Sequence, residues 1–381
     1  MKHLNIAILT EIIDYRSGSR APLDLARYLT RKNHEVTIYA YDLQLDTAAY
    51  HHLKKKGVNV IILPLKPIPH IARLFAAFSL WKLLKKQNHN VILFTGTLAF
   101  FFAGILSRIP IIRMYMGTQF DAILEDNIPT HVSFFSKALN VLGNLYVLSR
   151  EVPLTILSNG FVAISRYAAE EARRLYRRNV DATIYLGTTE FHAKKTAIKR
   201  RGKKDTVFLL SVSRITPYKG FHLIIKALQK TKTKKKVQFI IAGSQPKQPY
   251  IQYLKKLGGA NVTIHINPTD QDLSRLYQYA DIYLCADQYL HFGLTIFEAA
   301  QFRKPTIALN LGAAREIINN GKTGYVANNL NEFSFYLKKL IEDTKLRKKL
   351  GLNALQWSKG FSWEECADKW EKVLAKYAKQ P

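Results

Sequence analysis

Hydrophobic and polar positions follow two alternating patterns along this chain. Short apolar runs typical of buried strands, such as 5–10 (NIAILT) and 35–40 (EVTIYA), alternate with stretches of helical spacing, such as 21–33 (APLDLARYLTRKN). Pro22 suits the first turn of that helix, where a backbone N–H has no intrahelical partner. Strands that alternate with helices in this way predict right-handed crossovers and a mostly parallel sheet.

The alternation extends over the chain in two blocks. The predicted strands are 5–10, 35–40, 58–65, 90–96, 110–117, 160–165 and 182–187 in the first block, and 206–213, 237–244, 262–266, 281–286 and 305–310 in the second. Between the blocks, residues 192–205 (HAKKTAIKRRGKKD) lack periodicity and carry seven basic residues. Such a segment is typical of an exposed linker or hairpin between domains.

We therefore predict an α/β protein with two doubly wound, Rossmann-like domains that face a central cleft. The first domain is expected over 1–192 and the second over 205–360, and a helix over 361–381 could pack back towards the first domain. Ligands of such sheets bind beyond the carboxyl ends of the strands. The cleft between the domains is therefore the expected ligand site.

The charge of the chain points to anionic partners. Its 381 residues include 57 Lys and Arg against 28 Asp and Glu, a net charge of +29, which suggests nucleic acid, anionic lipid or phosphorylated substrates. No recognisable nucleic-acid module accompanies the charge, which argues against RNA or DNA binding. The two cysteines, Cys285 and Cys366, imply no disulfide framework, and the first residues show no secretory signal. We therefore expect a cytoplasmic protein.

Two apolar segments raise the question of membrane contact. Residues 91–107 (VILFTGTLAFFFAGILS) are barely long enough to span a bilayer, and a buried strand, a turn and a packed helix explain them better. Residues 68–87 could form a helix on the inner face of an anionic membrane, as a peripheral contact. A crossover helix packed on the sheet is an equally good interpretation. The apolar and basic residues interleaved there are Phe75, Phe78, Leu80 and Trp81 with Arg73, Lys82, Lys85 and Lys86.

A candidate anion site follows the first strand of the second block. Arg214 stands at the end of that apolar run, and Lys219 and Gly220 follow in a turn before an amphipathic helix. Arginine gives forked hydrogen bonds and lysine a mobile point charge, so the pair could clamp a diphosphate. The alternative is that both are solvated loop cations in a lysine-rich chain.

A second segment strengthens the phosphate hypothesis. Gly293 immediately precedes a helix that begins near Leu294, and a glycine there lets a ligand approach the free N–H groups of the helix N-terminus. Glu298 lies about one turn into that helix and could reach the hydroxyls of a ribose; it could equally be an acid that complements the helix dipole. Gly18 and Ser19, in the loop after the first strand, could approach a transferred group from the other side of the cleft.

Five stretches together resemble the family 4 glycosyltransferases, which have the GT-B fold and use nucleotide sugars. The stretches are SRITPYKGFHLIIKAL (213–228), HFGLTIFEAAQFRKPTIALNLGAAREIINNGKTGYV (291–326), SGSRAPLDLARYLTRKNHEVTIY (17–39), FVAISRYAAEEARRLY (161–176) and FSWEECADKW (361–370). The resemblance covers nearly the whole chain and is most specific over 207–326.

The resemblance implies a role for each matching residue. Arg214 and Lys219 would bind the donor diphosphate as the catalytic pair, and Glu298 would hold the nucleotide ribose. The first domain would lie on the acceptor side. The family transfers a sugar with retention of configuration and without a bound metal or cofactor. The residues implied to bind substrate are Gly18, Ser19, Phe292, Gly293, Leu294, Thr295 and Glu298.

Two positions depart from the family pattern. Leu290 stands where a second Glu usually contacts the donor sugar, and Met116 stands where a His is common. Asp121 or His291 could substitute for them. We expect a transferase that acts on a lipid-linked or cell-surface glycan acceptor, in polysaccharide biosynthesis. The alternative is a catalytically impaired relative that binds a nucleotide sugar or assists a partner transferase.

Overall fold

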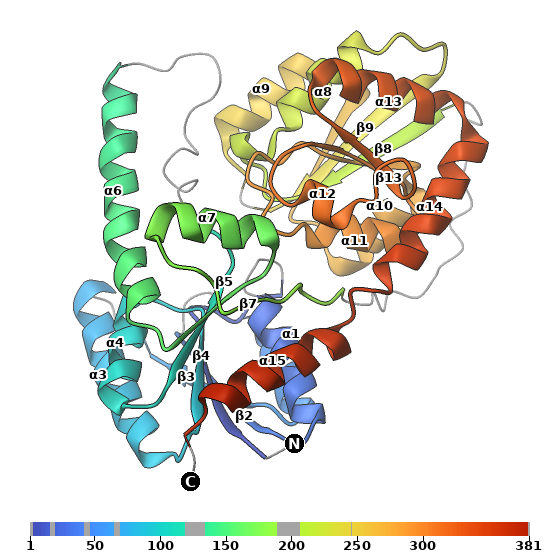
Figure 1. Cartoon of the computed structure of the whole chain (residues 1–381). Helices are drawn as coiled ribbons and strands as arrows, with labels where there is room; N and C mark the ends of the chain where they lie inside the picture. Colours follow the sequence, from blue (N-terminus) through green and yellow to red (C-terminus); the bar gives the residue numbers. More distant parts are fainter. Residues whose placement is uncertain are drawn as a thin grey trace. The chain divides into compact units, whose positions relative to one another are not determined.

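The computed structural model describes residues 3–15, 20–41, 46–64, 69–118, 134–188, 206–244 and 246–379. The chain forms two compact units, and each is an α/β fold of its own (Figure 1). The first unit comprises Met1–Thr118, Tyr146–Gly187 and Trp363–Pro381, and the second comprises Gln119–Leu145 and Thr188–Ser362. The predicted linker 192–205 lies outside the described residues, as do Gly18, Ser19 and Asp121.

The described part of the first unit contains a parallel seven-stranded sheet in the order β3-β2-β1-β4-β5-β6-β7. Every strand predicted in the first block is present, although 182–187 contributes only a two-residue strand. The strands are β1 (Asn5–Leu9), β2 (Glu35–Tyr41), β3 (Asn59–Leu63), β4 (Val91–Phe94), β5 (Ile111–Tyr115), β6 (Gly160–Ala163) and β7 (Ala182–Thr183).

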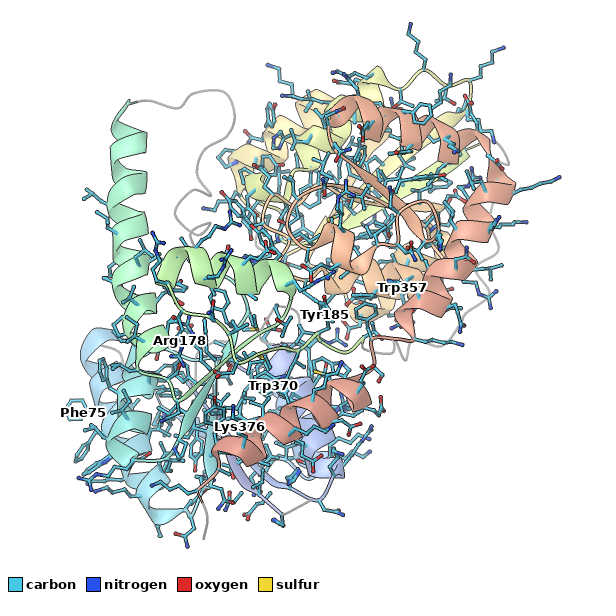
Figure 2. All side chains as sticks on the ribbon, viewed as in Figure 1. Phe75, Arg178, Tyr185, Trp357, Trp370 and Lys376 are labelled. Carbon is cyan, nitrogen blue, oxygen red and sulfur yellow. The ribbon has the colours of Figure 1, made fainter. Side chains whose placement is uncertain are left out.

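Helices connect these strands and cover the sheet. They are α1 (Arg20–Arg31), α2 (Thr47–Lys55), α3 (Pro69–Lys86), α4 (Leu98–Ser107), α7 (Arg166–Tyr176) and the C-terminal α15 (Trp363–Tyr377), with the long α6 (Phe134–Ile156) before β6. Within the first unit, α15 packs against α1. Its Trp363 ring stacks on Tyr28 with 6.2 Å between centroids, and Trp370 is fully buried (Figure 2).

Residues 91–107 adopt the predicted strand, turn and packed helix, as β4 and α4. Both elements contribute to the buried core of the first unit, which explains most of the apolar residues in the segment. Among the described residues, no helix has the length and apolar character that crossing a bilayer requires.

The described part of the second unit contains a parallel six-stranded sheet in the order β10-β9-β8-β11-β12-β13. Its strands are β8 (Thr206–Val212), β9 (Lys236–Gly243), β10 (Val262–Ile266), β11 (Ile282–Cys285), β12 (Thr306–Leu309) and β13 (Gly324–Ala327). Its helices are the short turn η1 (Pro217–Lys219), α8 (Phe221–Lys230), α9 (Gln248–Gly258), the short turn η2 (Gly259–Asn261), α10 (Asp270–Tyr279), α11 (Leu294–Gln301), α12 (Ala314–Ile317), α13 (Leu330–Glu342) and α14 (Thr344–Ser358).

Apolar residues on both faces of the central strands hold each unit together. Every residue of β4, β12 and β13 is buried, as expected of parallel strands with helices on both sides. In the second unit, buried residues of the sheet pack with residues of α8 and α13, such as Ile224 and Leu337. The prediction of two doubly wound α/β folds is therefore confirmed.

Candidate diphosphate site at the edge of the second sheet

The strand order of the second unit determines where a ligand can enter. From β8 the chain continues to β9 on one side, and from β11 it continues to β12 on the other side. Neighbouring parallel strands whose connections run in opposite directions leave a crevice at their carboxyl ends, which is the usual ligand site of this fold. The loops at this point are 213–220, after β8, and 286–293, after β11.

These two loops are tied together by their backbones. Gly220 has φ +70°, and a Cβ there would lie 2.1 Å from the carbonyl oxygen of Ala286. Since no side chain fits at that distance, a glycine is required for the loops to meet. The Gln288 N–H also donates to the carbonyl of Tyr218 at 2.9 Å. The loop that carries Arg214 and Lys219 is therefore held against the loop that leads to Gly293.

The two predicted clamp residues lie in different environments. Arg214 is exposed, and its guanidinium lies 5.5 Å from the centroid of the Tyr218 ring. The Lys219 ammonium lies 4.7 Å from the same ring and is only 14% exposed. Tyr218 is buried and contacts both cations, so its ring is a common support for them.

A carboxylate that the sequence analysis did not identify contacts Lys219. Asp287, two residues after β11, accepts a hydrogen bond from the lysine Nζ at 2.5 Å. Burial of the ammonium opposes its charge, but the carboxylate outweighs this effect and the pKa of Lys219 lies above its ordinary value. The strand order could have revealed Asp287, because it places the end of β11 beside the end of β8.

The Gly293 loop leads into α11 as the sequence predicts. Gly293 is left-handed, with φ +92°, and no side chain of the described residues caps the helix there. The first N–H groups of a helix, here those of Leu294 and Thr295, have no intrahelical partner and are available to an anion. Leu294 and Thr295 are half-buried, whereas Phe292 is buried and packs on Phe297. Phe292 therefore supports the loop from the core.

Glu298 is half-buried on α11, and its carboxylate has a defined orientation. The hydroxyl of Tyr277, on α10, donates to its Oε2 at 2.8 Å. Tyr277 itself is fully buried and stacks on Phe302 with an interplanar angle of 9°. The sequence analysis also missed Tyr277, which fixes the direction of the carboxylate that the ribose would meet.

Leu290 lies in the core and not on an open surface of the site. It is 4% exposed, and its carbonyl accepts the Ala313 N–H at 2.7 Å. A Cβ on Gly293 would lie 3.1 Å from the Leu290 side chain and 2.8 Å from Ile317. The side chain of Leu290 is thus part of the apolar support beneath the glycine loop, while His291 beside it is half-buried.

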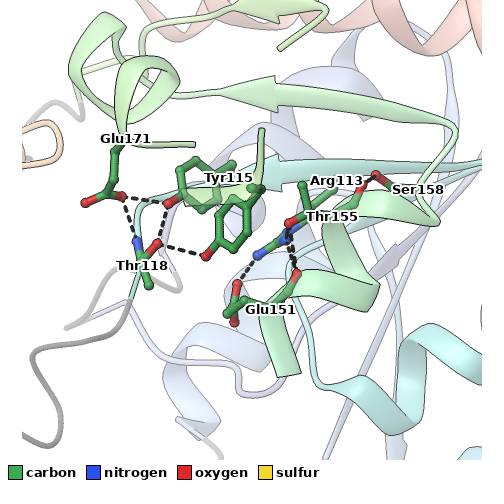
Figure 3. Close-up of polar contacts among 8 residues, drawn as sticks. Arg113, Tyr115, Thr118, Glu151, Thr155, Ser158 and Glu171 are labelled. Carbon is green, nitrogen blue, oxygen red and sulfur yellow. Dashed lines mark hydrogen bonds and ion pairs between the residues drawn. The ribbon is translucent and has the colours of Figure 1, made fainter. Parts of the chain in front are cut away.

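Met116 lies on a turn of the first unit that a polar network holds (Figure 3). The Tyr115 hydroxyl and the Thr118 N–H both donate to Glu171 Oε2 on α7, at 2.6 and 3.0 Å. Burial and the Glu171 carboxylate raise the pKa of Tyr115, which keeps it a donor. The half-buried Met116 between them has no polar group, so it cannot replace the hydrogen bonds of a histidine.

A second part of the same network anchors β5 to α6. Arg113 is buried, forms an ion pair with Glu151 and donates to the Thr155 hydroxyl (Figure 3). Its guanidinium also lies 5.4 Å from the Tyr115 ring. The charge of Arg113 is therefore satisfied inside the first unit, which indicates a structural role.

The chain is similar to known proteins in sequence and in fold. The family model for group 1 glycosyl transferases matches residues 193–357, and the model for glycosyltransferase family 4 matches residues 19–189. The α-D-kanosaminyltransferase of Streptomyces kanamyceticus is 26% identical over 201 residues, which is 49% of this chain and 52% of that protein. An uncharacterized glycosyltransferase of Methanocaldococcus jannaschii is 23% identical over 366 residues, 90% of each chain.

The fold is shared with solved structures. Anabaena HepE in complex with UDP and glucose has a TM-score of 0.75 at 18% identity, over 98% of this chain and 100% of that one. The chain spans about half the length of the first curated relatives that it matches. The two family models match successive parts of the chain and together cover most of it. By sequence and by fold, the chain belongs to the family 4 glycosyltransferases of the GT-B fold.

Proposed function

We propose that the protein transfers a sugar from a nucleotide-diphosphate sugar to a hydroxyl of a lipid-linked or cell-surface glycan acceptor, with retention of configuration. The observation that carries the proposal is the meeting of the Arg214–Lys219 loop and the Gly293 loop at the switch point of the second sheet. Two cations and a helix N-terminus at one sheet edge suit a diphosphate, which is the leaving group of such a transfer.

The chemistry follows from the groups present. The bond between the anomeric carbon and the diphosphate oxygen breaks, a bond to the acceptor oxygen forms, and the proton of the acceptor hydroxyl passes to the departing diphosphate. Negative charge develops on the departing diphosphate, where Arg214, Lys219 and the N–H groups after Gly293 would stabilise it. Glu298, oriented by Tyr277, would accept hydrogen bonds from the ribose hydroxyls. We propose that these groups act without a metal ion.

Donor turnover tests the proposal. Release of nucleoside diphosphate is measured for wild type and Glu298→Ala across a panel of nucleotide sugars that includes deoxy sugars. We expect wild type to turn over at least one donor well above the Glu298→Ala background. A donor that lacks one hydroxyl is a good candidate, because position 290 does not supply the carboxylate with which the family contacts the donor sugar.

A second candidate function is binding of a nucleotide sugar without turnover, and the two departures at Leu290 and Met116 favour it. A buried leucine and a thioether provide none of the polar contacts that the family has at these positions. A protein that binds nucleotide sugars without turning them over would show tight binding in the same panel and turnover no faster than Glu298→Ala. That result would identify a binding protein.

We also propose that the first unit contacts an anionic membrane through α3 and α4. One side of α3 is buried through Ala76, Leu80 and Leu84, so the expected lipid contact of Leu80 was wrong. Phe75 is 68% exposed and points away from the ribbon (Figure 2). Phe78 is 51% exposed. The neighbouring α4 exposes two further apolar residues, Phe102 and Leu106.

Basic residues accompany these apolar side chains. The Nζ atoms of Lys82 and Lys85 lie 4.5 and 4.6 Å from the ring centroids of Phe78 and Trp81. Aromatic rings with adjacent lysines suit the boundary between lipid headgroups and acyl chains. This arrangement favours membrane contact over a purely structural crossover helix.

Liposome flotation tests the membrane proposal. We expect more protein to float with anionic than with neutral vesicles at low salt, and the Phe75→Ser/Phe78→Ser variant to lose most of that binding. The control is Phe335→Ser, which removes a phenylalanine of the second unit with a similar exposure of 63%. Equal flotation of wild type with both lipids would refute the proposal.

A further inference from the structure

We infer that Asp287 is a positioning residue of the diphosphate site, which holds the Lys219 ammonium in place and in its charged form for the ligand. The inference rests on the proposed binding of a nucleoside diphosphate where β8 and β11 end. Asp287 would act through Lys219 and not on the ligand directly, because its own charge has the same sign as that of the diphosphate.

The geometry shows how Asp287 is fixed. It is 8% exposed, and its Oδ1 accepts the Tyr289 N–H at 3.0 Å while its Oδ2 accepts Lys219 Nζ at 2.5 Å. One oxygen is thus held by the backbone and the other holds the lysine. An ammonium has three donors, so a single carboxylate oxygen can fix its position and still leave donors for a phosphate.

The contact joins parts of the chain that are 68 residues apart. Lys219 ends the short turn after β8, and Asp287 follows β11, so the ion pair bridges the two loops at the switch point. The backbone contact between Gly220 and Ala286 lies directly beside it. A loss of the carboxylate would therefore release the lysine without removing the contact that joins the loops.

Burial and three neighbouring groups affect the charge of Lys219. Burial and the Arg214 guanidinium disfavour the ammonium, while Asp287 and the Tyr218 phenol favour it, and the net effect is a raised pKa of Lys219. Burial also raises the pKa of Tyr218. Burial, followed by Asp287, raises the pKa of Cys285 to about 12. With the phenol and the thiol neutral near pH 7, Asp287 is the anion that offsets the cost of burying the ammonium.

Asp287 has two opposing effects on a bound diphosphate. It keeps Lys219 charged, which strengthens binding, and it repels the ligand, which weakens binding. An affinity measured at one pH therefore does not isolate its role. The pH dependence does, because only the first effect decides at which pH Lys219 loses its proton.

The test is the affinity for UDP, measured by calorimetry from pH 7 to pH 10 for wild type and Asp287→Asn. We expect Lys219 of wild type to stay charged over most of this range, because its pKa lies above its ordinary value. In Asp287→Asn the carboxylate no longer offsets burial, so the loss of affinity between pH 7.5 and pH 10 should be about threefold larger than in wild type, or more. Because UDP titrates identically in both experiments, the comparison reports the protein. If Asp287→Asn does not fold, Asp287→Ser takes its place.

Two further variants separate positioning from a general structural effect. In Asp287→Asn/Lys219→Arg the alkaline loss should disappear, because arginine keeps its proton over this range. The matched control is Asp281→Asn at the other end of β11, where the carboxylate accepts the Phe208 N–H at 2.9 Å. It should keep the wild-type pH profile.

The outcomes distinguish this inference from the proposed function. If wild type binds UDP and Asp287→Asn has the same alkaline limb, the inference is wrong and the diphosphate site stands. If wild type binds none of UDP, GDP and ADP, the proposed function itself fails, and the inference fails with it.

Discussion

Tyr277→Phe should weaken nucleotide binding although Tyr277 is not expected to touch the ligand. The substitution removes one hydroxyl, which donates to Glu298 Oε2 at 2.8 Å. The ring remains, and its stacking on Phe302 should hold it in place. The change therefore alters the orientation of the Glu298 carboxylate and leaves the packing of α10 on α11 intact.

The size of the effect is limited by the hydrogen bond that Glu298 is expected to make with the ribose, because Tyr277 acts on the ligand only through that carboxylate. A hydrogen bond to a charged group contributes about 1.5–3 kcal/mol. Glu298 is half-buried, so water can replace part of the lost donor, and we expect a loss near the lower limit. A loss of about 1.4 kcal/mol corresponds to roughly tenfold weaker binding. Direct removal of the carboxylate in Glu298→Ala should cost at least as much.

The assay is calorimetric titration with UDP, compared with its 2′,3′-dideoxy analogue. If Tyr277 acts through Glu298 on the ribose, Tyr277→Phe weakens UDP binding and leaves the analogue unaffected. It should also add nothing in a Glu298→Ala background, as a double-mutant cycle would show. The control is Tyr250→Phe, a buried tyrosine of the same unit whose hydroxyl contacts His222 at 2.9 Å. Equal losses for UDP and the analogue would refute the reasoning.

Three further predictions follow from buried groups and from the charge of the site. Leu290→Glu should lower the free energy of unfolding by about 2–4 kcal/mol in urea titrations, because it places a carboxylate in the core beneath Gly293; an unchanged midpoint would show that the side chain reaches solvent. Burial lowers the pKa of His89 and His222 from 6.5 to about 4. Between these two pH values the unfolded chain binds protons that the folded chain does not. The free energy of unfolding should therefore be constant above pH 6.5 and decrease towards pH 4, by at most about 3 kcal/mol for each residue. His222→Gln should flatten this acid limb, and a limb of wild-type steepness would count against burial as its cause. EDTA should leave donor turnover unchanged, because Arg214 and Lys219 are expected to offset the diphosphate charge, and a loss restored by Mg²⁺ would contradict this.

The sequence predicts the elements of the site better than their contacts. The apolar run of β8 ends just before Arg214 and Gly293 precedes α11, because strand and helix periods are local properties. The strand order is not local, and it alone places Asp287 against Lys219. The same limit applies to Tyr277 and Glu298, which lie on different helices.

Burial of single residues was also beyond local patterns. Leu290 is in the core because residues that follow β12 cover it: Ala313 donates its N–H to the Leu290 carbonyl, and Ile317 lies beside Leu290 under Gly293. In α3, the side that faces the core carries Ala76, Leu80 and Leu84, which follow one another at intervals of four residues. A helix that is apolar on most sides does not reveal which side will be covered, so Leu80 was assigned to the wrong face.

Calorimetric titration of UDP into wild type, Arg214→Ala and Arg275→Ala tests the central claim most directly. Arg214 is exposed beside the switch point, so its removal should leave the fold intact, and Arg275 is an exposed arginine of the same unit on α10. The account predicts that Arg214→Ala loses about 1.5–3 kcal/mol of binding free energy, about 10- to 150-fold in affinity. Arg275→Ala should bind as wild type does. Equal affinity of wild type and Arg214→Ala would contradict the assignment of the diphosphate site.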